Sequence, residues 1–276
     1  MTKLSRSLAA AILLASAAAA SFAAPDRPVG LDVHPSLLEL HVSAGETIER
    51  RVTLTNPGED SLDVVAETAD WTMSESGEVR FEAAGTGANP RSCAGWIAVT
   101  PPKIRVPPKG EATVSVQISA PADLDGTRWA VVFFRLPDVP GFHGGRPADL
   151  TARVALTVYA TGSGTEREDL ELAGLSAVGS PEILLRAAFE NAGNTAVRVK
   201  MTWQIRSASG SVVRTDTATV VCLPGSRREA LDRVPKLPAG SYKVSAMARW
   251  GNRRWRLREC ALDVPAKASA SGRLVS

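Results

Sequence analysis

The sequence has few of the residues that carry most enzyme and metal chemistry. It contains three histidines (His34, His41 and His143) and three cysteines among 276 residues. None stands at a metal-ligand spacing, and no CxxC, HExxH, GxSxG or phosphate-binding glycine loop occurs. The carboxylates are scattered along polar positions, with no pair that has a reason to be buried. We therefore expect no catalytic residues, no metal and no cofactor.

Long apolar runs are also scarce. Residues 1–23 are expected to be a secretory signal peptide, because Lys3 and Arg6 precede a short run of alanine and leucine and Ala23 fits a cleavage site. No later run approaches the ~20 apolar residues that a membrane-spanning helix needs. The sequence thus predicts an exported protein, periplasmic in a bacterium, without an integral membrane segment.

Cysteine is too rare for a disulfide framework, but export to an oxidising compartment allows one pair. Cys222 and Cys260 both lie in strand-like runs of the second half and are the candidate disulfide. Cys93 would then remain, either as a free thiol or available to a partner.

Charge is distributed unevenly along the chain. Residues 24–168 carry 13 Lys and Arg against 20 Asp and Glu, whereas residues 169–265 carry 15 against 9. A basic second half could face nucleic acid, anionic lipid or an acidic protein. Export argues against nucleic acid. The alternative is that opposite charges help the two halves dock or keep both surfaces soluble.

Turn-forming residues are plentiful, with 22 glycines and 18 prolines at fairly regular intervals. They separate short runs of alternating apolar and polar residues, and no amphipathic helix is apparent. Such spacing is typical of all-β proteins and predicts two immunoglobulin-like β-sandwich domains in tandem. The expected boundaries are 24–160 for the first domain, 161–169 for a linker, 170–265 for the second domain and 266–276 for a disordered tail.

The clearest alternation runs from Asp149 to Ala160. One face of this predicted strand is apolar and consists of Leu150, Ala152, Val154, Leu156 and Val158. In one interpretation these side chains belong to the protein's own core. In the other, the strand lies at a sheet edge and is lent to a partner chain by strand addition.

Several motifs of the first half share an order with a known family. They are Asn56-Pro57, Asp70-Trp71, Gly77 with Phe81, Trp96-Ile97-Ala98-Val99-Thr100-Pro101, Pro108-Lys109-Gly110, Val114 with Val116, Pro121, Gly126 and Phe133. This order resembles the N-terminal domain of periplasmic pilus chaperones, the PapD-like superfamily. The resemblance implies a second sandwich, and it places Asp149 to Ala160 where those chaperones carry the strand that they lend to pilus subunits.

The chain departs from this family at two basic positions. The family has a Thr-Arg pair on its first strand, where this chain reads His34-Pro35-Ser36-Leu37, and a lysine on the lending strand, where this chain has Leu156. The resemblance implies that these two residues hold the carboxylate of a subunit. Arg153, Arg50 or Arg51 are candidate substitutes.

An arginine-rich segment near the C-terminus has no role in that resemblance. It contains Arg249, Arg253, Arg254, Arg256 and Arg258 with Trp250 and Trp255. The segment is either an anion-binding face with aromatic stacking or a solvated hairpin whose arginine stems cover the tryptophan rings.

These observations predict a periplasmic chaperone-like protein that stabilises exported pilus, fimbrial or related surface subunits by lending a β-strand. The alternative function is a non-catalytic module of the cell envelope that has the same fold and binds another surface protein or a polymer.

Overall fold

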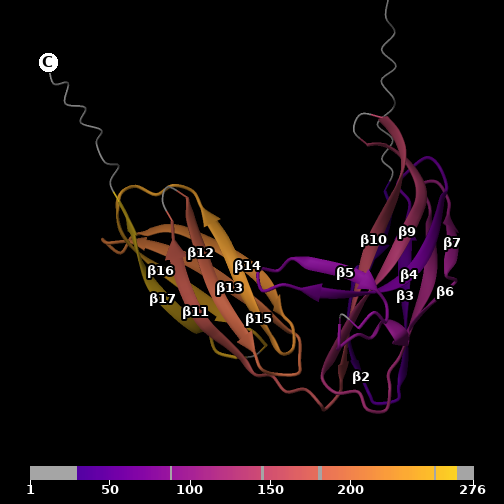
Figure 1. Ribbon diagram of the computed structural model, residues 1–276, viewed down its shortest axis with the longest axis horizontal. Helices are drawn as coiled ribbons and strands as arrows, with labels where there is room; N and C mark the ends of the chain where they lie inside the picture. The colour runs from indigo at the N-terminus through magenta and orange to yellow at the C-terminus, as the bar shows by residue number, and fades with distance from the viewer. Residues whose placement is uncertain (1–29, 88, 144–145, 180–181, 252, 266–276) are drawn as a thin grey trace, which may run out of the picture.

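The computed structural model describes residues 30–87, 89–143, 146–179, 182–251 and 253–265, without the side chains of residues 137–151. Within this part of the chain, all regular structure is β-strand apart from one short 3-10 helix, η1 (Ala94–Trp96). The strands form two sandwiches that follow one another along the chain (Figure 1). The predicted all-β fold with two sandwiches is confirmed. The expected signal peptide and C-terminal tail lie outside the described residues.

The first sandwich has two sheets. One sheet has the strand order β1 (Asp32–His34), β3 (Thr47–Thr55), β8 (Glu111–Ser119), β6 (Ile97–Thr100). The other has the order β2 (Leu37–Val42), β10 (Arg146–Gly162), β9 (Thr127–His143), β4 (Leu62–Met73), β5 (Val79–Ala83), with β7 (Lys103–Val106) also paired to β4. The β10–β2 pair is parallel, and the other ladders are antiparallel.

The second sandwich also has two sheets, both antiparallel. One contains β11 (Leu170–Val178), β12 (Ile183–Asn191) and β15 (Ser226–Val234) in that order. The other has the order β14 (Val212–Cys222), β13 (Val197–Ser207), β16 (Gly240–Arg249), β17 (Arg256–Val264). Each sandwich has an apolar core of its own, and a third apolar cluster lies between the two. The boundaries expected for the two domains and for the linker stay a prediction.

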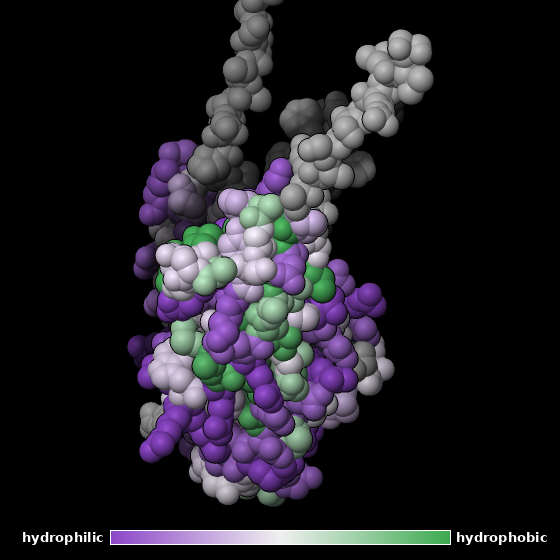
Figure 2. All heavy atoms as spheres, turned by 90° about the vertical axis from the view of Figure 1, so that its left-hand side faces the viewer, coloured by the Kyte–Doolittle hydropathy of each residue, from purple (hydrophilic) through white to green (hydrophobic). Residues whose placement is uncertain are grey.

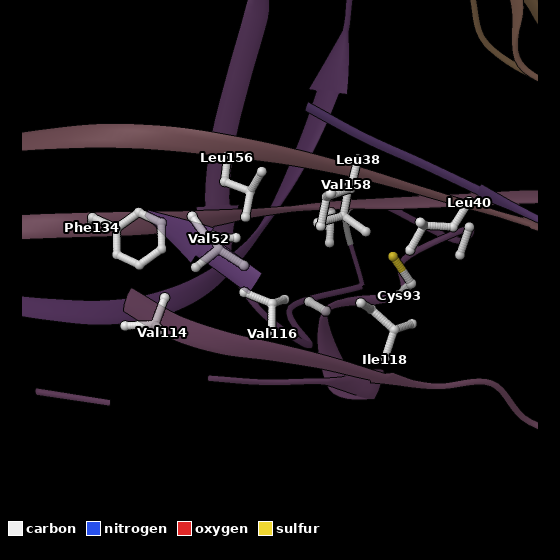
Figure 3. Packing of buried hydrophobic residues seen from close by; sticks show 14 of the residues in the cluster. Leu38, Leu40, Val52, Cys93, Val114, Val116, Ile118, Phe134, Leu156 and Val158 are labelled. Atoms are coloured by element: carbon white, nitrogen blue, oxygen red, sulfur yellow. The ribbon is translucent and has the colours of Figure 1, made fainter. Parts of the chain in front are cut away.

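Alternation along each strand sends one set of side chains into the core. In β8, for example, Val114, Val116 and Ile118 are buried, while the residues between them are at least partly exposed. Figure 3 shows Leu156 and Val158 of β10 directed toward the opposite sheet. Full burial of each such side chain contributes roughly 1.5–3 kcal/mol to folding.

The N-terminal strand of the first sandwich divides between the two sheets. Its first part, β1, pairs with β3, and its second part, β2, pairs with β10 of the facing sheet. Pro35 and Ser36 lie between the two parts. Proline has no N–H to donate, so it is suited to the point where a strand leaves one ladder for another.

The prolines and glycines from Pro137 to Pro147 suggest a loop before β10, but the structure shows strand here. Strand β9 continues to His143, and β10 already begins at Arg146, so most of this segment is paired backbone. The prolines are compatible with a strand here because β4 accompanies β9 only over Val131–Arg135. Farther along, one side of β9 has no partner among the described strands, and a missing N–H there breaks no ladder bond.

The structure also corrects the candidate disulfide, since Cys222 and Cys260 are both free thiols. They lie on β14 and β17, the two outer strands of a four-stranded sheet, with β13 and β16 between them. Strands in a sheet are ~4.8 Å apart, so the cysteines are separated by well over the ~7 Å that a disulfide can bridge. Sequence spacing could not reveal this, because it does not show that β14 and β17 lie at opposite edges of the sheet.

We expect three free thiols per chain, even under oxidising conditions. Burial raises the pKa of both Cys93 and Cys222 to about 12, so neither should react with a thiol reagent while the protein is folded. Titration with Ellman's reagent in denaturant should give three thiols per chain. A value of one would show that a disulfide does form.

Candidate strand-addition site

Strand β10 has different neighbours along its length. From Thr157 to Gly162 it lies between β9 and β2. From Arg146 to Leu156 it pairs with β9 alone, and among the described residues no strand lies on its other side. The first half of β10 therefore has an open edge.

The start of β2 determines where this open edge ends. The Thr157 N–H donates a hydrogen bond of 3.0 Å to the Ser36 carbonyl, just before β2 begins at Leu37. Main-chain groups alternate in direction along a strand, so those of Ala155 and Arg153 point the same way as those of Thr157. They face the open edge, because the chain before Ser36 belongs to the other sheet.

Beyond the sandwich, β9 and β10 continue as a two-stranded ribbon (Figure 1). Their ladder runs to the pair His143 and Arg146, with a register shift between Leu150 and Ala152. Neither β4 nor β2 accompanies the ribbon this far. A ribbon of two strands gains little stability by itself, and a third strand on either edge would add hydrogen bonds and packing.

The predicted apolar row of β10 is graded from buried to exposed. Leu156 and Val158 are fully buried in the first core, and Val154 packs partly against it. Ala152 is exposed, and the side chain of Leu150 lies outside the described residues. Leu156 and Val158 thus complete the protein's own sandwich, which is the first of the two interpretations of this strand. Only the part of the row before Leu156 has apolar surface to offer a partner.

The two candidate anchor arginines lie in different sheets. Arg153 is an exposed residue of β10, and its guanidinium extends away from the open edge, across β9, where its carbon is 4.3 Å from the ring centre of Phe133 and 5.7 Å from that of Phe81 on β5. These rings form an edge-to-face pair with centroids 5.0 Å apart. Arg50 is on β3, where it donates a 2.8 Å hydrogen bond to the Glu49 carbonyl. The structure does not bring the two cations together.

The outer face of the β10 sheet is directed toward the second sandwich. Its aromatic residues form the third apolar cluster with a leucine of the loop after β14, and the members are Trp71, Trp129, Val131, Phe133, Tyr159 and Leu223. The Trp71 ring lies 6.1 Å from that of Trp129 and 6.0 Å from that of Tyr159, and Trp129 Nε1 donates to the Trp71 carbonyl at 3.0 Å. Burial raises the pKa of Tyr159 to about 12. This packing joins the two sandwiches.

Asn194 is the polar centre of the same junction. Its carbonyl accepts the Thr127 N–H at 2.8 Å, its Nδ2 donates to Asp125 Oδ1 at 2.9 Å, and its Oδ1 accepts the Arg167 N–H at 2.7 Å. Gly126, between the two first-sandwich partners, has a φ of +58°. A Cβ atom at Gly126 would overlap the Asn194 backbone and side chain, so the junction requires glycine here.

The β4–β5 hairpin forms a second bridge between the sandwiches. Figure 1 shows it extending from the first sandwich to the second. At its tip, the Glu75 carbonyl accepts the Glu229 N–H at 2.7 Å and Arg228 Nη1 at 3.1 Å. Near the start of β2, Arg198 Nε and Glu39 Oε1 form an ion pair of 2.5 Å. The hairpin contact, the ion pair and the Asn194 junction fix the angle between the two sandwiches.

Sequence reasoning missed most of this junction. In the sequence, Trp71 and Gly126 stand out only as parts of the family motifs. Asn194 belongs to the turn-like run Asn191-Ala192-Gly193-Asn194 and shows no other feature. The sequence did contain a signal, because Trp71 and Trp129 both lie in strand-like runs, at positions that alternate with apolar residues. Side chains that alternate out of the core and are still aromatic suggest a second contact surface.

The described residues contain neither a metal-binding cluster nor a candidate membrane-spanning helix. Across the described ranges, no three His, Cys, Asp or Glu side chains gather in a way that could hold a metal ion. In the same residues, no helix is long and apolar enough to cross a membrane. His41 Nδ1 instead lies 3.1 Å from Glu166 Oε1, as a surface pair.

Comparison with known proteins gives similarity in solved structures only. No family model matches the chain, and no curated protein matches it. The class 5 fimbriae chaperone CfaA is 13% identical over 86% of this chain and all of its own, with a TM-score of 0.46. The YadV chaperone is 16% identical, covering 84% of this chain and 99% of its own, with a TM-score of 0.44.

The complex of CsuC with CsuE from Acinetobacter baumannii also has a similar chain, at 12% identity, 84% and 98% coverage and a TM-score of 0.45. Fimbrial chaperones are thus among the similar structures, and they are the family that the sequence motifs resemble. A PapD-like domain of human CEP192, 12% identical over 57% of this chain and 97% of its own with a TM-score of 0.31, is similar too. The function must therefore be argued from this chain's own geometry.

The glycine at the Asn194 junction yields a direct test. We expect Gly126→Ala to lower the free energy of unfolding by about 1–3 kcal/mol, because the new Cβ meets both an unfavourable φ and the Asn194 backbone. Gly164→Ala is the matched control, since Gly164 has a φ of +80° and open space around it. Urea unfolding should show the smaller loss for the control. Equal losses would mean that the contact with Asn194 contributes nothing.

Proposed function

We propose that this protein is an exported, periplasmic, chaperone-like protein that binds other exported subunits by strand addition along the open edge of β10. The observation that carries the proposal is the change of neighbours at Thr157, which leaves the first half of β10 with no partner on one side among the described strands. The partner is a β-rich subunit whose own sheet lacks a strand. No catalytic step is part of this function.

The gain in free energy comes from backbone pairing and from burial of the exposed part of the apolar row. Each hydrogen bond to the Arg153 and Ala155 main chain contributes about 0.5–1.5 kcal/mol net. Ala152 and the half-buried Val154 add apolar contact, and Leu150 belongs to the same alternation. Leu156 and Val158 hold the lending strand on its own sandwich, so the strand remains part of the chaperone while it pairs with a subunit.

Arg153 supplies the cation of this site. It lies on the strand that carries the open edge, and among the described residues no carboxylate forms an ion pair with it. Its stacking on Phe133 leaves it positioned for an anionic group of a subunit. Arg50, on the facing sheet, is the weaker candidate for this role.

One observation favours the alternative of an envelope module that binds a folded protein or a polymer. Leu156 stands where the resembled family has a lysine, and it is fully buried. A second basic residue from β10 is therefore missing, and with it a charge-assisted bond to a subunit carboxylate.

Proline substitution at the open edge separates the two functions. Ala155→Pro removes one N–H that faces the edge and leaves the ladder with β9 intact, so the fold should lose no more than about 1 kcal/mol. Ala155→Ser keeps the N–H and is the control. In capture from the periplasm of the native host with the tagged full chain, a small β-rich subunit should come with wild type and Ala155→Ser but be lost with Ala155→Pro. Equal capture by all three would favour the envelope module.

A further inference from the structure

The arginine-rich segment of the second sandwich forms a surface that the proposed strand addition does not use. It covers the turn between β16 and β17 and the start of β17, and every described residue from Arg253 to Glu259 is exposed. We define the basic patch by the residues Lys200, Arg249, Arg254, Trp255 and Leu257. Arg256 alternates with Trp255 and Leu257 along the chain, and it lines a pocket with Glu168, Asp169 and Glu171 instead. The Arg253 Nε to Glu168 Oε2 distance of 3.8 Å places the turn beside the segment that joins the two sandwiches.

The patch has an excess of positive charge after its ion pairs are taken into account. Arg253 pairs with Glu168, and Arg258 lies 3.3 Å from Glu171. For Arg249, Arg254 and Arg256, no carboxylate of the described residues comes within ion-pair distance, and the same holds for Lys200, the β13 neighbour of Arg249. Three of them, Lys200, Arg249 and Arg254, therefore present a positive field to whatever approaches this end of the sandwich, whereas the three carboxylates around its pocket offset the charge of Arg256.

Two large apolar side chains are exposed among these cations. Trp255 is 51% exposed and Leu257 is 56% exposed. Leu257 pairs across the ladder with Met247 on the outer face of the sheet, and the Trp255 ring lies 5.1 Å below the Arg249 guanidinium. The neighbouring Trp250 is buried in the second core. The predicted hairpin in which arginine stems cover both tryptophan rings is therefore found only in part, because Arg249 leaves Trp255 half exposed. Figure 2 shows apolar side chains exposed among polar ones on this side of the molecule.

We propose that the basic patch docks on an anionic lipid surface. Guanidinium groups bind lipid phosphates, while tryptophan prefers the headgroup region and leucine the acyl boundary beneath it. An acidic protein or a soluble polyanion would satisfy the three cations of the patch, but it would not account for the exposure of Trp255 and Leu257 beside them. Docking would hold the chain at a membrane surface by the second sandwich and leave the open edge of β10 free.

Vesicle sedimentation of the full exported chain tests this surface. Binding to vesicles containing about a third phosphatidylglycerol should exceed binding to pure phosphatidylcholine vesicles, and it should weaken as salt is added. Removing two cations with Lys200→Gln and Arg254→Gln should weaken binding by about 25-fold at low salt, because each basic residue near the surface contributes roughly fivefold. The charge-matched control is Arg227→Gln with Arg233→Gln, on β15, which should change binding less than twofold.

The apolar part of the patch is tested separately. Trp255→Ser with Leu257→Ser should weaken vesicle binding by at least tenfold without changing the net charge. Wild-type tryptophan fluorescence should shift to the blue on binding, and this shift should be absent in that variant. Absence of binding to anionic vesicles overturns the proposal. Binding that depends on the cations but not on Trp255 and Leu257 also overturns it, because the surface would then recognise anions in general, as on an acidic protein.

Discussion

The structure depends on one constraint, the passage of the first strand from one sheet to the other at Pro35 and Ser36. Because β1 completes the β3 sheet, β2 is too short to cover the whole of β10. The cover ends at Thr157, and the rest of β10 is open on that side as far as the described strands extend. A single change of sheet thus closes the core at one end and exposes a strand edge at the other.

An exposed edge is a liability in most β proteins because it invites uncontrolled pairing. Here the strand that carries the edge, β10, also carries an exposed arginine, Arg153, and is anchored by Leu156 and Val158 in the core. The angle of the second sandwich is fixed by the aromatic cluster, the Asn194 junction and the β4–β5 hairpin. A partner that pairs with β10 near Leu156 would therefore meet a strand that is already held in place by the first sandwich.

The sequence predicts the fold well, because periodicity and turn residues act locally. The alternation from Leu150 to Val158 is enough to recognise a strand with one apolar face, and Pro35 is enough to expect a break in the first strand. Facts that depend on strand order were beyond reach. Spacing suggested that Cys222 and Cys260 could pair, but two intervening strands separate them.

The candidate site was predictable in part. The alternation identified a strand, β10, but the buried and exposed halves of this strand have the same pattern in sequence, and only the position of β2 distinguishes them. Arg50 and Arg153 looked equivalent as isolated cations, although the sheets place them apart. Asn194 and Gly126 act across the junction, over a long sequence separation, and no local pattern predicts such a contact.

Amide hydrogen exchange along β10, measured by NMR on the free protein, tests the open edge most directly. The Thr157 N–H is bonded to Ser36 and should be protected, whereas the Arg153 and Ala155 N–H groups should exchange at least about 100-fold faster. Rapid exchange at these two amides, next to protected Val154 and Leu156, is the result that the account predicts. Protection of Arg153 and Ala155 equal to that of Thr157 would contradict it, because the edge would then be covered in the free protein.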